Sequence, residues 1–551
     1  MGCRLASTNH LPFRCRDNES IRHSPKGEVV MSLSPQSTNL AELARWSCET
    51  YSEVVAIRDG DISLTYAELG EVTKNAAAAI IAAGVGPGDV VAIWAPNCWQ
   101  WLVASMGISR AGAVVLPVNT RFKGAEAAHV LNTAEARIVF IVDGFLDTDY
   151  SGMLATQDLP TVQQVIDLST SAFDDFLATG DEALFDEVEA RTDAVTYDDI
   201  GAIMFTSGTT GHPKGVLVRG GAMVRSFSGW GAAMDVRIGD PYLIVNPYFH
   251  AFGFNGGIVM CLLFGATNIP FPVYEPVAVM QIIEREKVAI FPGPPALYQG
   301  LLNDPDLDNY DVSSLRGCIT GAASIPVEMI EAMRTRLGFK DISTAYGMTE
   351  TSGIVTYTLN GDPDELVSNT SGCVIDDVEV RIVDEEGNDV PCGEPGELLV
   401  RGYQVTPGYL LGDGGITKAT DDDDWLHTGD VVVMNELGYI DITDRIKDMY
   451  IVGGFNAYPA EIERMMVEHP DIGMASVIGV PEARLGEVGA AFIVRAPGSI
   501  ITEEAVIAWC REEMANYKVP RHVWFVDTLP LTPSNKVQKP VLREWAAERM
   551  P

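Results

Sequence analysis

The sequence TSGTTGHPKG, residues 206–215, decides how the rest of this 551-residue chain is interpreted. Apolar runs at residues 200–205 and 216–218 flank it, so we expect a loop between two buried strands. The loop holds four hydroxyls, three glycines and one lysine. Glycines let the backbone approach a ligand closely, and N–H groups, hydroxyls and an ammonium suit a polyphosphate. The predicted phosphate-binding residues are Thr206, Ser207, Gly208, Thr209, Thr210, Gly211 and Lys214.

This loop differs from the Walker A phosphate loop. Walker A requires Gly before the lysine and Ser or Thr after it, and here Pro213 and Gly215 occupy those places. A polar turn without a ligand is the alternative interpretation.

Composition excludes several classes of function. Asp and Glu outnumber Lys and Arg by 76 to 38, and the formal net charge of −38 argues against a nucleic-acid partner. No apolar run reaches the ~20 residues of a membrane span, so we expect no integral membrane protein. The nine cysteines form no CxxC pair and no zinc pattern, which is typical of reduced thiols in a cytoplasmic protein. The sequence leaves open whether the chain forms a homo-oligomer.

The order of expected elements indicates an α/β fold. Residues 40–51 have helical spacing, residues 54–57 and 62–64 resemble strands, and Thr65 with Glu68 forms a capping box at the next helix. Strands and helices then alternate, with strands at 89–94 and 113–118 around a helix at 101–111. Such alternation predicts parallel sheets with crossover helices.

Three parts of the chain are predicted. Residues 1–33 form a polar extension that we expect to be disordered, and residues 34–443 form a large N-terminal domain of parallel-rich sheets and helices. Residues 444–551 form a small, mobile α+β C-terminal domain, with its expected helices at 460–466 and 503–514 and strands at 475–480, 490–494 and 523–526.

Residues 206–215 resemble the signature loop of the adenylate-forming superfamily, which includes acyl-CoA synthetases, peptide-synthetase adenylation domains and beetle luciferases. The resemblance runs from about residue 39 to the C-terminus, and later motifs follow in the order of that family. It implies a large and a small domain that bind ATP, Mg²⁺, CoA and a carboxylic acid between them.

The segment NPYFHAFGF, residues 246–254, combines four aromatic rings with His250. By itself this is equally compatible with a core strand that holds one satisfied histidine. The resemblance implies that His250 borders the substrate carboxylate. It also implies an apolar acyl pocket lined by His250, Phe252, Phe254 and Gly347.

Two segments, residues 320–326 and 344–350, place small residues after apolar runs. The resemblance implies an adenine slot, with Tyr346 stacked on the base, Thr349 on the α-phosphate and Glu350 on Mg²⁺. Mg²⁺ takes one or two carboxylates beside phosphate oxygens and water, and Thr206 is a second candidate ligand. Alone, Glu350 is more simply a solvated carboxylate at a helix start. The slot is expected to comprise Gly321, Ala322, Ala323, Ala345, Tyr346 and Gly347.

The remaining motifs concern the ribose, the hinge and CoA. The resemblance implies that Asp430 accepts hydrogen bonds from both ribose hydroxyls and that Arg445 reaches the ribose or phosphate. It implies a hinge at Lys447 and a passage for pantetheine at Gly453 and Gly454.

A lysine near the C-terminus completes the expected catalytic set. In the family this lysine contacts the substrate carboxylate and the α-phosphate, and Lys536 matches it, with Lys539 as the second choice. The residue before it is commonly Gly and is here Asn535, which tolerates left-handed backbone better than most residues. The predicted catalytic residues are Lys536, Thr349, Glu350 and His250.

The leading hypothesis is an ATP-dependent acyl-CoA synthetase that forms an acyl-AMP and then an acyl-CoA thioester, releasing AMP and pyrophosphate. Its acid is expected to be a fatty acid or a propanoate side chain of a sterol-derived ring. Three alternatives remain: an adenylation enzyme that loads a separate carrier protein, a luciferase-like oxygenase, and a non-catalytic nucleotide sensor.

Overall fold

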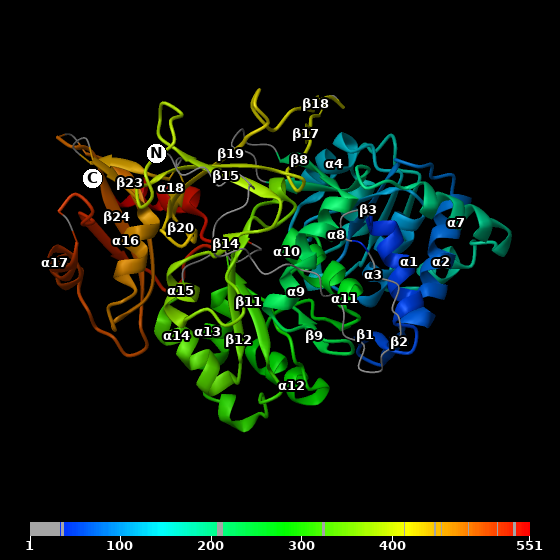
Figure 1. Ribbon diagram of the computed structural model, residues 1–551, viewed down its shortest axis with the longest axis horizontal. Coiled ribbons are helices and arrows are strands. Elements are labelled where there is room, and N and C mark those ends of the chain that lie inside the picture. Colours follow the sequence, from blue (N-terminus) through cyan, green and yellow to red (C-terminus); the bar gives the residue numbers. More distant parts are fainter. Residues whose placement is uncertain are drawn as a thin grey trace.

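The structure, a computed structural model, describes residue 34 and residues 38–206, 213–321, 325–412, 414–445, 448–452, 455–482, 484–514, 516–532 and 536–550. The side chains of residues 232, 444, 445, 451, 455 and 456 are not described. The predicted extension, residues 1–33, lies outside the described residues. Figure 1 shows the C-terminal part, orange to red, at one end of the molecule and α1–α3, in blue, near the other.

The phosphate loop belongs to an eight-stranded sheet, in which β7 and β8 form an antiparallel hairpin next to the parallel strands β4, β3, β5 and β6. In order, the strands are β18 (Ile416–Thr417), β17 (Tyr409–Leu410), β8 (Lys214–Arg219), β7 (Ile200–Thr206), β4 (Val114–Pro117), β3 (Val90–Trp94), β5 (Ile138–Ile141) and β6 (Gln164–Asp167).

Both faces of this sheet are buried. On β3, Val91 and Ile93 belong to one core while Val90, Ala92 and Trp94 belong to another. This is why the strand is a continuous apolar run, as buried parallel strands are. The first core holds α1 (Leu40–Thr50), α2 (Tyr66–Ala82), α3 (Trp99–Arg110), α8 (Gly220–Ser228) and α11 (Met260–Phe264), and the second holds α4 (Gly124–Thr133) and α5 (Tyr150–Ala155).

A second layer of strands lies across the first core. It consists of two four-stranded sheets that Ile290 joins by parallel bridges to Tyr242 and Gly317. Helices α12 (Pro276–Glu286), α13 (Pro295–Asn303) and α14 (Val327–Ala332) share a further core with it. The strands are β2 (Ile62–Thr65), β1 (Val55–Asp59), β10 (Thr267–Pro270) and β9 (Pro241–Ile244), then β11 (Gly317–Gly321), β12 (Asp341–Tyr346), β13 (Thr356–Tyr357) and β14 (Cys373–Val374).

A third, antiparallel sheet leads toward the small domain. Its strands are β15 (Val378–Val383), β16 (Gly396–Gly402), β19 (Leu426–Met434) and β20 (Ile440–Arg445). The small domain has its own sheet and apolar core. It contains β21 (Tyr450–Val452), β22 (Phe455–Ala457), β23 (Ile472–Glu482), β24 (Gly486–Arg495) and β25 (His522–Phe525), with α16 (Pro459–Met466), α17 (Glu503–Glu513) and α18 (Lys539–Arg549).

Most expected elements are present. The Thr65 side chain accepts a hydrogen bond from the Glu68 backbone N–H while the Glu68 carboxylate accepts one from Thr65, so the predicted capping box at α2 is confirmed. The expected α/β class is confirmed as well. The division predicted after residue 443 stays a prediction, and β20 runs two residues past it, to Arg445. No helix among the described residues is long and apolar enough to span a membrane.

The acidic segment that precedes β7 contains two α-helices. The structure has α6 (Ser171–Leu177) and α7 (Phe185–Ala194) there, and α7 packs on α2 and α3. Phe173 and Val188 are buried, so this acidic segment contributes to the core despite its weak periodicity.

Candidate active site

The hairpin of β7 and β8 holds both ends of the predicted phosphate loop. Thr206 is the last residue of β7 and pairs with Lys214, the first residue of β8. The predicted strands on either side of the phosphate loop are thereby confirmed. The residues between them, including Ser207, Gly208, Thr209, Thr210 and Gly211, lie outside the described residues.

The side chains of Lys214 and Glu350 both contact Tyr409, a residue that the sequence analysis did not predict for the site. The Lys214 ammonium lies 5.5 Å from the centroid of the Tyr409 ring, and the Tyr409 hydroxyl donates to Glu350 Oε1 at 3.3 Å. Burial, together with the Glu350 charge, raises the pKa of Tyr409, so its hydroxyl stays a donor. Strand β17, which carries Tyr409, pairs with β8, and this pairing brings the three side chains together.

Glu350 is fixed by its backbone as well. It belongs to η6 (Thr349–Thr351), a short 3₁₀ helix that packs against β8. The Glu350 carbonyl accepts a hydrogen bond of 2.7 Å from the Thr406 backbone N–H. Thr349 and Glu350 therefore lie beside the strand that begins at Lys214, as expected of residues that contact the same phosphates.

The predicted adenine and ribose residues meet where the end of β12 lies near the middle of β19. Gly321 pairs with Ala345 across β11 and β12, and the Tyr346 hydroxyl donates to the Asp430 carboxylate. Asp430 is only 2% exposed. Its backbone pairs with Arg445, whose side chain is not described, while Ala322 and Ala323 lie outside the described residues.

Gly347 has no room for a side chain. A Cβ atom there would lie 2.3 Å from the Gly353 carbonyl oxygen and 2.4 Å from Ile354 Cα, which are both backbone atoms. The turn after Tyr346 therefore requires glycine, because real Cβ contacts are longer than this.

His250 begins a short helix rather than lying in a strand. It caps α10 (Ala251–Gly253), where its Nδ1 accepts a 3.2 Å hydrogen bond from the Phe252 backbone N–H. The segment is therefore not a core strand, and the role of His250 beside the substrate carboxylate stays a prediction. Burial, and secondly the positive charge of Lys536, lower the pKa of His250 to about 4. The imidazole is neutral at physiological pH.

Lys536 of the small domain is therefore close enough to His250 of the large domain for its charge to affect that pKa. Lys536 is exposed, and the loop before it is closed by a bridge between Leu531 and Val537. The Thr532 backbone N–H donates to the Lys536 carbonyl at 2.7 Å, and the Lys536 N–H donates to the Thr532 hydroxyl at 3.0 Å.

Lys539, the second choice for this role, points elsewhere. Its ammonium lies 3.3 Å from Glu463 Oε1 within the small domain, and its side chain is only 15% exposed. The same Glu463 oxygen accepts from the Ser476 hydroxyl and the Val477 backbone N–H. This environment is that of a structural ion pair, which favours Lys536 as the catalytic lysine.

The two phenylalanines predicted for the acyl pocket have different surroundings. Phe252 is half-buried and stacks on Trp230, with ring centroids 5.7 Å apart. Phe254 is fully buried and packs edge-on against Trp101 at 5.2 Å. Phe252 is thus the better placed of the two, and the part of Phe254 in the pocket stays a prediction.

An ion pair joins the two domains near the predicted hinge. Arg464 of α16 lies 3.0 Å from Asp441 of β20, and α16 packs against that strand. Lys447, Gly453 and Gly454 lie outside the described residues.

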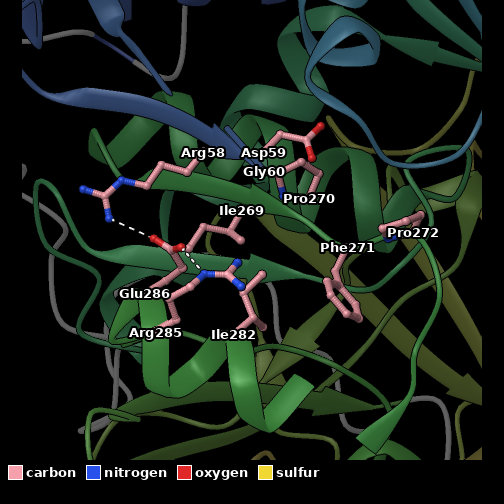
Figure 2. A pocket seen from close by; sticks show the side chains of 10 residues that line it. All are labelled: Arg58, Asp59, Gly60, Ile269, Pro270, Phe271, Pro272, Ile282, Arg285 and Glu286. Atoms are coloured by element: carbon pink, nitrogen blue, oxygen red, sulfur yellow. Dashed lines mark hydrogen bonds and ion pairs between the residues drawn. The ribbon is translucent and has the colours of Figure 1, made fainter. Parts of the chain in front are cut away.

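A separate cavity lies away from the predicted site residues. Figure 2 shows it between β1, β10 and α12, with Arg58 and Arg285 both directed at Glu286. Its volume is about 190 Å³, and its walls contain none of the predicted site residues. The active site is therefore identified by the chemistry of the residues that meet, and not by the size of a cavity.

Comparison with known proteins identifies the family. The sequence profile described as AMP-binding enzyme matches residues 44–410, and that of the AMP-binding enzyme C-terminal domain matches residues 461–536. The chain belongs to the AMP-binding enzyme family.

The curated relatives of this AMP-binding enzyme are acyl-CoA ligases. It is 43% identical over 523 residues to the 3-[(3aS,4S,7aS)-7a-methyl-1,5-dioxo-octahydro-1H-inden-4-yl]propanoyl:CoA ligase of Rhodococcus jostii, covering 93% of this chain and 99% of that protein. It is 44% identical to the ligase of the same name from Mycobacterium tuberculosis, covering 88% and 94%. The medium-chain acyl-CoA ligase ACSF2 of Homo sapiens is 31% identical, covering 89% and 84%.

Solved structures agree. The anthranilate CoA ligase AuaEII in complex with anthranoyl-AMP superposes with a TM-score of 0.83 at 26% identity, covering 94% of this chain and 99% of that one. ATP-bound MatB from Rhodopseudomonas palustris gives 0.80 at 29%, covering 92% and 99%. The AMP-binding enzyme is thus an AMP-forming acid–thiol ligase, and the ligase hypothesis is confirmed.

Proposed function

We propose that this AMP-binding enzyme attaches CoA to a propanoic acid that is itself the side chain of a fused, ketone-bearing ring system. The observation that carries the proposal is the identity of 43% and 44% to two ligases named for such an acid, across almost their whole lengths. The human medium-chain ligase is more distant, at 31%. A medium-chain fatty acid is the second candidate.

The aromatic side of the site supports a ring substrate. Phe252 follows His250 by two residues and presents a half-buried ring that is backed by Trp230. Flat aromatic walls give large contact areas to a rigid ring system at little conformational cost. The carboxylate end would lie at His250 and Lys536.

The site needs no general base for the first step. A carboxylic acid has a pKa of about 4 in water, so it is already ionised at neutral pH and can attack the α-phosphorus directly. What the protein must supply is charge neutralisation and alignment. We assign these roles to Lys536, Thr349, Lys214 and the loop after Thr206, while Asp430 and Tyr346 hold the nucleoside.

The carboxylate of Glu350 fits a magnesium ion. It is a single carboxylate beside the strand ends that hold Thr206 and Lys214, and no group of three potential metal ligands exists among the described residues. Mg²⁺ takes one or two carboxylates beside phosphate oxygens and water, which is the environment expected here. When bound by Glu350, with Thr206 as second candidate, it would neutralise charge on the phosphates of ATP.

Lys536 must then leave so that the CoA thiol can attack the mixed anhydride and release AMP. We assign the rotation to Lys447 and the passage of pantetheine to Gly453 and Gly454. The expected cytoplasmic location and any homo-oligomer stay predictions.

The test is a direct assay of acid preference. Purified enzyme with ATP, Mg²⁺ and CoA is offered the indane-dione propanoate, octanoate and a longer fatty acid, and AMP and acyl-CoA are measured by mass spectrometry. We expect the ring acid to have the highest kcat/KM. A higher kcat/KM for octanoate would overturn the proposal in favour of the medium-chain alternative.

A further inference from the structure

Trp230 is the middle ring of a three-ring stack that ends at Phe252, a predicted member of the acyl pocket. It belongs to α9 (Trp230–Ala233), and its ring stacks on Phe227 of α8 with centroids 4.5 Å apart and planes at 30°. On its other side lies Phe252, at 5.7 Å and 26°. Phe252, the ring at this end of the stack, is a predicted member of the acyl pocket.

The indole N–H of Trp230 is buried without a partner. The residue is 3% exposed, and its Nε1 makes no hydrogen bond within the described part of the chain. An unpaired buried donor destabilises the fold, and buried tryptophans usually find an acceptor. Phenylalanine would supply the same stacking without this cost, so the stack alone does not explain a tryptophan here.

Trp230 lies against elements that carry predicted members of the acyl pocket. A Cβ atom at Gly256 would lie 3.0 Å from Phe252 Cδ2 and 3.1 Å from Trp230 Cη2, so the backbone of η3 (Phe254–Val259) lies directly against both rings. Helix α9 also packs on β12, the strand that leads to Gly347. Gly347 and Phe252 are two predicted members of the pocket, and Trp230 lies between the elements that carry them.

A second buried indole provides the contrast. Trp101 also has an Nε1 without a partner among the described residues, but its ring packs on Tyr248 and Phe254, which are both fully buried. These two ring neighbours are therefore closed off from solvent. An orphan N–H in that position is a packing cost, whereas the indole of Trp230 stacks on Phe252, a half-buried ring that is a predicted member of the acyl pocket.

We propose that Trp230 is a specificity-determining residue whose indole N–H donates a hydrogen bond to a ring ketone of the acid. The inference rests on the proposed function, because a straight-chain fatty acid has no acceptor beyond its carboxylate. A site that hydrogen-bonds a substrate group rejects an analogue that lacks this group, since its own polar atom is then left unpaired. Trp230 would thus select ketone-bearing ring acids over plain hydrocarbon acids.

The test compares Trp230→Phe with the native enzyme on two acids, the indane-dione propanoate and the same ring acid without its ketones. We expect the variant to lose about tenfold in kcat/KM on the diketone, the equivalent of a hydrogen bond of about 1.4 kcal/mol, and to be unchanged on the deoxygenated acid. Trp101→Phe is the matched control and should change kcat/KM equally for both acids.

The two proposals fail separately. If native enzyme prefers the diketone but Trp230→Phe lowers activity equally on both acids, the hydrogen bond is refuted and the proposed function stands. If native enzyme prefers octanoate to either ring acid, the proposed function itself fails. Should Trp230→Phe not fold, 3-benzothienylalanine at position 230 keeps the shape without the N–H, and the same selective loss on the diketone is required of it.

Discussion

The two walls of the active site are held by different means. On the large-domain wall, each acidic side chain has a tyrosine donor: Tyr346 bonds Asp430, and Tyr409 bonds Glu350. On the small-domain wall, Lys536 is exposed on a loop that Thr532 ties at its base. The protein's own hydrogen bonds hold the acidic side chains of the large-domain wall in place. The small-domain wall contributes the charge of Lys536, which can be withdrawn. This contrast suits a reaction with two steps in one cleft.

Replacing Lys536 is expected to have the largest effect on the reaction rate. Lys536→Ala should slow pyrophosphate release by about 10²–10³-fold, the usual cost of removing one group that stabilises developing charge. Thioester formation from supplied acyl-adenylate should change little, because Lys536 has left the site by then. Both half-reactions are measured separately by stopped-flow and mass spectrometry.

Lys539→Ala is the control for that prediction. It lies three residues further on but pairs with Glu463, so it should lower the thermal stability of the small domain and leave adenylation nearly unchanged. Equal losses in both half-reactions for folded Lys536→Ala would contradict the two-step use of the cleft.

Substitutions in the large-domain wall are expected to have a smaller effect, and for Tyr346 this effect is on nucleotide binding. Tyr346→Phe removes the donor to the buried Asp430 carboxylate, and a hydrogen bond to a charged group is worth about 1.5–3 kcal/mol, so KM for ATP should rise about tenfold or more. Tyr409→Phe is its counterpart: it removes the Tyr409 donor to Glu350 and should change the Mg²⁺ requirement without this rise in KM for ATP. ATP and Mg²⁺ titrations of pyrophosphate release separate the two, and identical behaviour of both variants would refute the division of roles.

The third prediction concerns a pKa rather than a rate. Since burial and Lys536 hold the pKa of His250 near 4, Lys536→Ala should raise it measurably in an NMR titration. Between pH 6.5 and about 4 the unfolded chain binds a proton that folded His250 does not, so the free energy of unfolding falls as the pH falls through this window. His250→Asn should reduce that acid sensitivity in urea unfolding at about pH 7 and about pH 5. An unchanged slope would show that the pKa of His250 is not lowered by folding, and an unchanged NMR titration in Lys536→Ala would place His250 away from the Lys536 charge.

Local chemistry made much of the fold predictable. Two kinds of feature could be predicted because they depend only on residues that are close in the sequence. These are the capping box at Thr65 and Glu68 and the apolar runs of β3 and β7. Tyr409 could not be found this way. Its role depends on β17 pairing with β8, almost two hundred residues earlier, and a Gly-Tyr pair after Thr406-Pro407 carries no local sign of that.

The site shows the same limit. Lys536 and Lys539 lie close together in one stretch of sequence, and only the ion pair to Glu463 distinguishes them physically. Phe252 and Phe254 likewise differ by two residues, yet one is half-buried and the other lies in the core. Periodicity cannot resolve this, because the segment changes from cap to α10 to a π-helix within ten residues.

The glycine at position 347 restricts how the acid preference of such a ligase can be redesigned. Shrinking a pocket by adding a methyl group requires neighbours that can yield, and at Gly347 the obstacles are the carbonyl of Gly353 and the Cα of Ile354. At Gly256 the obstacles are the edges of two side-chain rings, Phe252 and Trp230. Engineering toward smaller acids should therefore begin with Gly256→Ala, and libraries that vary position 347 will consist mainly of misfolded chains.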